Sequence, residues 1–361
     1  MTQERSATAR LRDDPTRLDQ VFERLRDDVA KGVVPTAALA VGDADGGIRS
    51  EAFGGKRRQI TTDDYFFLAS VTKPIFATAF MQLVEDGLVG LDDPIAKWLP
   101  EFDEGDKRKV TARQLLTHTS GVPEYPLDRL ARERPSVERQ TRATLAAPLI
   151  AEPGTRYEYC TSSYLLLAAM IERITSTRYR AFLHDRVLEP LAMRTTFDPR
   201  RAGRKIVSVE GVGLDNAIVR FLMLRYLAGT ALPGGGLFGT LDDMLRFGAA
   251  TLRPLESDGR PIPTSSATFS LMGEDQLHGV TGTYDGEERE VHHGLGWGKP
   301  TLMHDLPGSP RVVSHGGASG TRLWIDPDAG LVFVYFTNVW SAERSAENAA
   351  LSGTYRALAA S

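Results

Sequence analysis

The sequence contains a single cysteine, Cys160, among 361 residues, and this excludes an internal disulfide. It also lacks long apolar stretches, because the longest, residues 164–171 and 331–336, are far too short to cross a bilayer as helices. The N-terminal residues are polar and include no apolar core of the kind found in secretory leaders. Together these absences predict a cytoplasmic protein without a membrane partner.

The sequence also lacks a large excess or a cluster of charges of one sign. The net charge is −4 and no block of like charge occurs, so neither nucleic acid nor an anionic membrane is an expected partner. The composition, with 42% hydrophobic and 25% charged residues, is typical of a globular protein. At this length we expect one large domain or two closely packed ones, and the sequence does not determine the oligomeric state.

Several motifs that would indicate other chemistries are absent. No His-Glu-x-x-His occurs, and His292 and His293, being adjacent on an expected strand, would point to opposite faces, so no metal site is expected. The glycines at 234–236 have no following Lys-Ser/Thr and indicate a tight turn instead of a phosphate loop. No Gly-x-Ser-x-Gly occurs, which argues against an α/β-hydrolase. We expect no metal or organic cofactor.

Strand-like segments lie near both ends of the chain, with helical segments between them. We predict hairpins over residues 36–53 and 322–337, and helices that include residues 18–29, 111–116, 162–174, 182–188, 241–251 and 342–359. This order favours an α/β (α+β) fold with one antiparallel sheet, flanked by helices, built from residues 1–80 and 280–361. Residues 81–279 would form a mostly helical region, with the active site between the two parts.

Three segments are expected to be irregular. Residues 253–270 are rich in proline and serine and are interpreted as a surface excursion. Residues 125–134 and 216–226 are interpreted as loops that face the active site and influence its choice of substrate.

Ser70 and Lys73 stand three residues apart at the start of an apolar run that continues to Leu83. On a helix the two side chains share one face and can touch. A serine hydroxyl becomes a useful nucleophile when a neighbour takes its proton, and a lysine does so only if desolvation or positive charge lowers its pKa. The apolar approach over residues 66–68 would supply a dry wall, and the helix N-terminus a backbone N–H for an oxyanion. The alternative interpretation is a serine N-cap beside a solvated lysine.

Two further stretches strengthen the nucleophile interpretation. They are Pro-Gly-Thr-Arg-Tyr-Glu-Tyr-Cys-Thr-Ser-Ser-Tyr at 153–164 and Val-Val-Ser-His-Gly-Gly-Ala-Ser-Gly at 312–320, with supporting stretches at 115–121, 190–193, 234–237 and 240–243. With these residues the chain resembles the serine hydrolase family shared by class C β-lactamases, D-Ala-D-Ala carboxypeptidases, D-aminopeptidases and family VIII carboxylesterases. The resemblance runs from about Gly32 to Thr337 and implies a β-lactamase/transpeptidase-like fold.

The resemblance implies a role for each residue of the motifs. Ser70 would be the acylated nucleophile, Lys73 its proton partner and Tyr159 the phenol that relays protons and activates the deacylating water. The backbone N–H groups of Ser70 and Ala318 would form the oxyanion hole. A phenol acts as a base near neutral pH only beside positive charge, which Lys73 or a protonated His315 would supply.

Two departures from the lactamase pattern bear on the substrate. The resemblance places a motif on the strand that lines the cleft, which His315, Gly316 and Gly317 match and where many relatives carry Lys-Thr-Gly. The lysine of those relatives is permanently charged, whereas a histidine is charged only part of the time near neutral pH. Thr161 stands where lactamases and peptidases carry an asparagine that holds the substrate's amide. These four residues are expected to bind substrate, and the changes favour an ester over an anionic lactam or a peptide.

We therefore expect a serine hydrolase that forms an acyl-enzyme, most simply a carboxylesterase acting on small to medium esters. The alternatives are a D-amino-acid amidase or peptidase, a β-lactamase or penicillin-binding protein, an acyltransferase, and a non-catalytic pocket protein. The expected partner is a small-molecule ester or amide. Cys160 is interpreted as buried filler, and His118 as a residue that organises a loop near the cleft.

Overall fold

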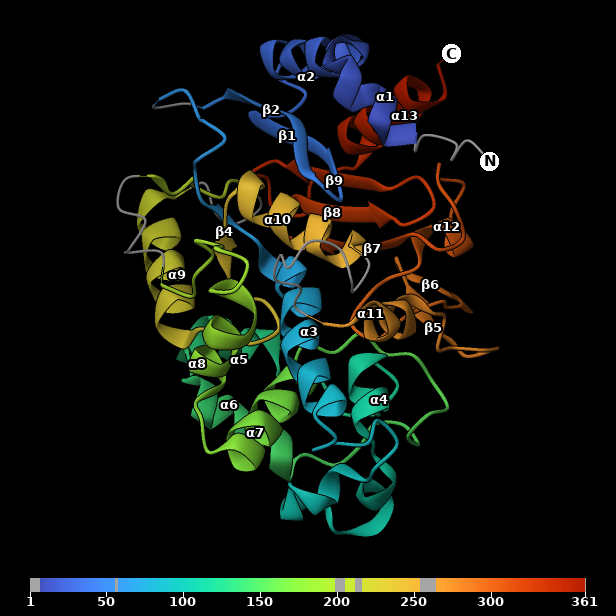
Figure 1. Cartoon of the computed structure of the whole chain (residues 1–361). Coiled ribbons are helices and arrows are strands. Elements are labelled where there is room, and N and C mark those ends of the chain that lie inside the picture. The colour runs from blue at the N-terminus through green and yellow to red at the C-terminus, as the bar shows by residue number, and fades with distance from the viewer. Residues whose placement is uncertain (1–6, 56–57, 199–204, 212–215, 254–263, 361) are drawn as a thin grey trace, which may run out of the picture.

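A five-stranded antiparallel sheet organises the molecule, with strand order β2-β1-β9-β8-β7 (Figure 1). The computed structural model describes residues 7–55, 58–198, 205–211, 216–253 and 264–360. The sheet strands are β1 (Thr36–Asp43), β2 (Gly46–Gly54), β7 (Val313–Gly317), β8 (Thr321–Asp326) and β9 (Leu331–Phe336). Both predicted hairpins are confirmed. Because β1 pairs with β9, the two ends of the chain complete one sheet, as predicted.

Helices cover both faces of this sheet. Figure 1 shows α1 (Ala7–Asp13), α2 (Asp19–Ala30) and α13 (Ser345–Ala359) on one face and α10 (Leu241–Leu252) on the other. Double coverage explains why every residue of β1, β8 and β9 is buried. Gly248 allows α10 to lie close to the sheet, since a Cβ there would come within 2.5 Å of Val332 Cγ1.

Helix α3 (Thr72–Glu85) runs from the sheet into the helical region and is buried on nearly all sides. Its apolar residues on every face are typical of a central helix. It contacts α7 (Ser163–Thr175) and α8 (Tyr179–Leu183), and with the inner face of the sheet these elements form the main hydrophobic core. The remaining helices of the helical region include α4 (Ala112–Leu116), α5 (Leu127–Glu133), α6 (Val137–Ala146), α7 (Ser163–Thr175), α8 (Tyr179–Leu183) and α9 (Ala217–Thr230).

Polar side chains fix the approach to α10. Thr240 and Asp243 form a capping box at its N-terminus, each side chain accepting from the other residue's backbone N–H. The fully buried Asp243 carboxylate also accepts hydrogen bonds from the Arg194 N–H at 2.8 Å and the Thr195 hydroxyl at 2.9 Å. The stretch at 240–243 therefore anchors the 190–195 turn to the helix that covers the sheet.

The segments expected to be irregular differ from the prediction. Residues 127–133 and 217–230 form α5 and α9, and residues 266–273 form α11, so all three expectations of loop were wrong in part. Buried Phe269 and Met272 dock α11 against the core, which a proline- and serine-rich composition does not reveal. Residues 254–263 of the predicted excursion lie outside the described residues.

Short strands and one short helix complete the fold. They are β3 (Phe66–Phe67) paired with β4 (Phe238–Gly239), β5 (Thr281–Tyr284) paired with β6 (Glu287–Glu290), and α12 (Pro300–Met303). The division at residues 80 and 280 stays a prediction, since α10 belongs to the middle segment by sequence but packs on the sheet. Among the described residues, no helix combines the length and apolar character that a bilayer span requires. The cytoplasmic location also stays a prediction.

Candidate active site

Ser70 lies in a short 3-10 turn, η2 (Ala69–Val71), between strand β3 and helix α3. The turn is held from the sheet, because the Thr321 hydroxyl donates to the Leu68 carbonyl at 2.9 Å. Ala69 has a φ of 45°, a left-handed conformation that is costly for any residue other than glycine. The backbone immediately before Ser70 is therefore strained and is kept in place by its neighbours.

Lys73 reaches Ser70 from the first turn of α3. Its side chain is fully buried, and its Nζ lies 3.4 Å from the Ser70 Oγ, 3.2 Å from the Thr161 Oγ1 and 2.8 Å from the Gly234 carbonyl oxygen. Within the described ranges, no carboxylate lies at ion-pair distance from this amine. The amine is thus held beside the serine hydroxyl by neutral oxygens only.

Tyr159 brings a phenol to the same place from a distant stretch of the chain. The Lys73 Nζ lies 4.7 Å from the centroid of the Tyr159 ring, which is a cation–π distance. The ring packs 4.6 Å from the ring of His118 and 6.3 Å from that of His315, and 41% of the residue stays exposed. The amine of Lys73 therefore lies close to both the Ser70 hydroxyl and the ring of Tyr159.

The end of β7 closes the site on the other side. A Cβ on Gly317 would lie 2.4 Å from the Leu68 carbonyl oxygen, so glycine permits this close approach to η2. Ala318 follows directly, and its carbonyl accepts from the Ser341 N–H at 2.7 Å. In the described part of the chain the Ala318 N–H has no acceptor. The oxyanion hole formed by the N–H groups of Ser70 and Ala318 stays a prediction.

The histidines around the site are buried, and burial lowers the pKa of each. His315 is 8% exposed, and burial, followed by the positive charge of Lys73, holds its pKa well below the ordinary value. Burial also lowers the pKa of His118 well below the ordinary value and that of His293 to about 4. The sequence did not reveal this burial, which opposes a protonated His315, and the source of positive charge for the phenol stays a prediction.

Glu124 is a residue of the site that sequence reasoning missed. Its carboxylate accepts a short hydrogen bond from the Thr161 N–H and another from the Ser162 hydroxyl at 3.2 Å. Because the Thr161 hydroxyl contacts Lys73, the Glu124 carboxylate helps to position the lysine indirectly, through Thr161. The only local signal was its position soon after the 115–121 stretch, which does not distinguish it from a surface acid.

The interpretations of Cys160 and His118 agree with the structure. Cys160 is buried, and burial raises the pKa of its thiol to about 12, which keeps it unreactive. Its N–H donates to the His118 Nδ1 at 3.1 Å, so His118 fixes the backbone next to Tyr159. His118 thus organises this loop, as predicted.

A cavity of about 240 Å³ lies beside Tyr159 and His315. Two arginines in its wall were not singled out from the sequence. Arg322 is ion-paired with Glu347 at 2.5 Å. Arg344 is exposed and lies beside Gly316, because its Nη2 atom would be 3.5 Å from a Cβ placed on that glycine. The cleft therefore keeps a permanent cation although His315 replaces a lysine. Its lining comprises Tyr157, Tyr159, Thr283, Tyr284, Asp285, His293, Gly298, Pro300, Ser314, His315, Gly316, Arg322 and Arg344.

Metal-ligand geometry occurs away from this cleft. Among the described residues, the one cluster with donors close enough for a shared ion is His184, Asp185 and Glu189, all exposed beyond α8. His292 instead contacts Asp275 at 2.6 Å, and His293 contacts the Gly294 carbonyl. None of these groups is among the partners of Ser70 or Lys73.

Comparisons with known proteins agree with this geometry. The family model described as Beta-lactamase matches residues 18–354. Penicillin-binding protein 4 of Amycolatopsis lactamdurans is 32% identical over 319 residues, 84% of this chain and 81% of that protein. Esterase EstB of Burkholderia gladioli is 30% identical over 374 residues, 89% of this chain and 90% of that protein. The structure titled "EstCE1, a hydrolase with promiscuous acyltransferase activity" superposes with a TM-score of 0.78 at 20% identity, covering 95% of this chain and 99% of its own. The chain therefore belongs to the beta-lactamase family of serine hydrolases.

Proposed function

We propose that this protein is a carboxylesterase acting on small to medium esters through an acyl-enzyme on Ser70. The observation that carries the proposal is the 3.4 Å separation between the Ser70 Oγ and the buried Lys73 amine. The relative named as esterase EstB adds support, as does the cleft of about 240 Å³, a volume suited to a small acyl group.

In acylation, the Ser70 Oγ attacks the ester carbonyl carbon and passes its proton to the neighbouring Lys73 and Tyr159 pair. The N–H groups of Ser70 and Ala318 hold the oxyanion of the tetrahedral intermediate, a contribution of about 3–4 kcal/mol per donor. The carbon–oxygen bond to the alcohol then breaks, and the alcohol leaves with the proton. Lys73 is suited to this exchange because its surroundings offer neutral oxygens and no carboxylate among the described residues.

In deacylation, water takes the place of the departed alcohol. Tyr159 removes a proton from this water, which attacks the acyl carbon, and the Ser70 oxygen leaves with a proton returned by the same pair. The exposed face of Tyr159 is consistent with access of water to the phenol. Thr161, through its hydroxyl, would position Lys73 as well as line the substrate path.

His315 has a packing role in this proposal instead of an electrostatic one. Burial lowers its pKa well below the ordinary value, so the proposal assigns the ring no charge near neutral pH. We expect wild type and His315→Asn to have parallel pH–rate profiles around neutral pH. A loss of activity on raising the pH that disappears in His315→Asn would restore a charged role.

The nucleophile is tested by covalent labelling. A fluorophosphonate should add to wild type and not to Ser70→Ala, as read by intact mass spectrometry. Equal labelling of both proteins, or an unlabelled wild type that still folds, would contradict the acyl-enzyme proposal. A p-nitrophenyl ester series of increasing acyl length, run beside nitrocefin, then measures the preferred substrate.

A penicillin-type substrate is the second candidate, and Arg344 is the observation that favours it. Its guanidinium beside Gly316 offers a permanent cation for the carboxylate of a lactam. The relative named penicillin-binding protein 4 adds support. Rapid nitrocefin turnover with inert p-nitrophenyl esters would place this candidate first.

A further inference from the structure

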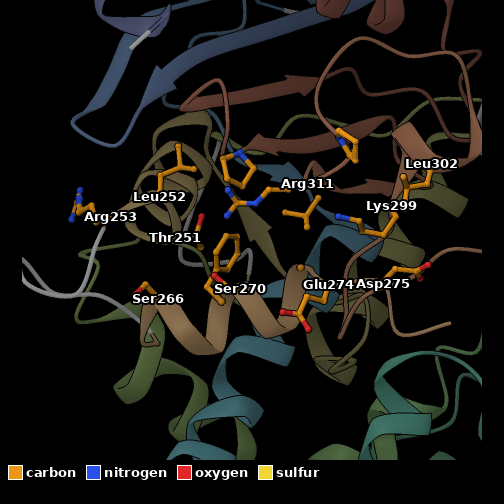
Figure 2. A pocket seen from close by; sticks show the side chains of 15 residues that line it. Thr251, Leu252, Arg253, Ser266, Ser270, Glu274, Asp275, Lys299, Leu302 and Arg311 are labelled. Atoms are coloured by element: carbon orange, nitrogen blue, oxygen red, sulfur yellow. The ribbon is translucent and has the colours of Figure 1, made fainter. Parts of the chain in front are cut away.

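A second cavity, of about 640 Å³, lies away from the catalytic residues, near the start of β7 (Figure 2). The end of α10, helix α11, the start of α12 and the segment before β7 form its walls. Ser70, Lys73 and Tyr159 do not line it. Its volume is that of a small-molecule binding site and exceeds that of the catalytic cleft. The mechanism proposed above makes no use of it.

Lys299 is the unusual residue of this cavity. It is only 3% exposed, and Figure 2 shows its amine pointing into the pocket. Over the described ranges, its ammonium has neither a hydrogen-bond nor an ion-pair partner. The two nearby carboxylates have other partners: half-buried Asp275 binds His292 at 2.6 Å, and buried Asp326 accepts from the Tyr355 hydroxyl at 2.7 Å.

A buried ammonium without a partner destabilises the folded state, because it loses hydration and gains nothing in return. Burial accordingly lowers the pKa of Lys299 to about 8. Charged residues at such positions are rare unless they are paired. An anionic group in the cavity would supply the partner that Lys299 lacks.

The other walls indicate what carries that anion. Leu252, Phe269, Leu302 and Val313 present apolar surface to the cavity. A ligand that pairs with the Lys299 ammonium and also packs against these apolar side chains has one anionic group and an apolar body.

The remaining charged groups define the field around Lys299. Arg311 and Arg253 line the same pocket. The Arg311 guanidinium binds Asp328 at 2.8 Å, the Arg253 Nε donates to the Ala44 carbonyl at 3.0 Å, and Glu274 is the other carboxylate in the wall. The groups that act on Lys299 are three carboxylates, Asp275, Asp326 and Asp328, and one guanidinium, Arg311. This excess of negative charge favours a singly charged ligand over a phosphate, because a dianion would be repelled more strongly by Glu274 and Asp275 in the wall.

We propose that this cavity is a second binding site, which takes a small organic carboxylate with its anionic group on Lys299 and its apolar body against Phe269 and Leu302. The site is separate from the catalytic cleft and does not depend on the reaction assigned to Ser70. Bound carboxylate replaces the hydration that the ammonium lost, so it also favours the protonated lysine.

The test uses 1-naphthoate as the probe and 1-naphthalenemethanol as its neutral counterpart, titrated by calorimetry into the full chain at pH 6.5. We expect Lys299→Met to weaken naphthoate binding by tenfold to a hundredfold, since one charge-assisted hydrogen bond is lost, and Lys299→Arg to stay within about fivefold of wild type. Binding of the neutral alcohol should change by less than about twofold in either variant.

Arg344→Met is the matched control, because it removes a cation from the catalytic cleft instead. Naphthoate affinity that falls in Arg344→Met and not in Lys299→Met would place the carboxylate in the cleft and overturn the proposal. Failure of naphthoate to bind wild type at millimolar concentration would also overturn it. Wild-type affinity should further decrease as the pH rises through about 8, and an unchanged affinity at pH 9.5 would contradict the assignment to Lys299.

Discussion

Lys73 and Lys299 are both buried lysines, 0% and 3% exposed, yet their surroundings are opposite. The amine of Lys73 has three oxygen partners, from Ser70, Thr161 and Gly234. That of Lys299 faces a cavity lined by both polar and apolar side chains and has no partner among the described residues. In the two proposals above, the amine with internal partners, Lys73, takes part in catalysis. The amine without them, Lys299, binds an anionic ligand.

Replacement of each lysine by methionine is the sharpest way to break this comparison. We expect Lys73→Met to lower turnover of p-nitrophenyl butyrate by at least about a hundredfold, the scale of a positioned acid–base group. Lys299→Met should keep turnover within about twofold of wild type. Steady-state kinetics on the two variants measures both values, and comparable losses in the two proteins would show that the lysines are not functionally distinct.

The pH dependence of stability tests whether Lys299 lacks a partner. Its folded pKa of about 8 lies below the ordinary 10.5, so between these values the unfolded chain holds a proton that the folded chain has released. The free energy of unfolding therefore rises with pH in this window because of Lys299, and below pH 8 the buried charge is destabilising. We expect Lys299→Met to be more stable than wild type by about 2 kcal/mol at pH 7, with the gap closing towards pH 10.5.

Urea unfolding at several pH values measures this difference. Lys31→Met is the matched control, because it makes the same substitution at an exposed lysine, which is paired with Asp27. A Lys299→Met protein that is less stable than wild type at pH 7 would mean that the amine has an internal partner.

Glu124 tests whether the network around Lys73 extends beyond direct contacts. We expect Glu124→Gln to lower kcat by about tenfold, because the hydrogen bond to the Thr161 N–H loses its charge and the Thr161 hydroxyl shifts against Lys73. KM should change little, since Glu124 does not line the cavity beside His315. A changed KM with an unchanged kcat would make Glu124 a substrate-binding residue instead.

The smallest expected effect concerns Arg344, an exposed cation of the catalytic cleft. We expect Arg344→Gln to lower kcat/KM for an ester that carries a carboxylate by about threefold to fivefold, and to leave a neutral ester unchanged. Parallel assays with a hemisuccinate ester and the matching butyrate ester measure the ratio. An equal effect on both esters would show that the arginine supports the fold of the cleft and not its selectivity.

The parts of the fold and site that the sequence predicted are those with local patterns. Alternating or continuous apolar residues revealed the two hairpins, and Ser70, Lys73 and Tyr159 lie in recognisable motifs. Helix α11 was missed because its two buried residues, Phe269 and Met272, depend on distant partners. The lowered pKa of His315 was missed for the same reason, since a histidine's pKa depends on burial that spacing along the chain does not determine.

The surroundings of Lys299 also could not be predicted from the local sequence. Its neighbours in sequence, Gly298 and Pro300, indicate a turn and give no sign that the amine enters a cavity. The walls come from α10, α11 and the approach to β7, segments separated by dozens of residues. Only the tertiary arrangement brings them around one charge.

The pairing of β1 with β9 has a consequence for biosynthesis. Residues 38–42 find their second neighbour in residues 332–336, which leave the ribosome some 290 residues later. Thr321, which holds the backbone before Ser70, also belongs to this late segment. A nascent chain can therefore form helices early, but the contact that holds the backbone before Ser70 forms only after Thr321 has been synthesised.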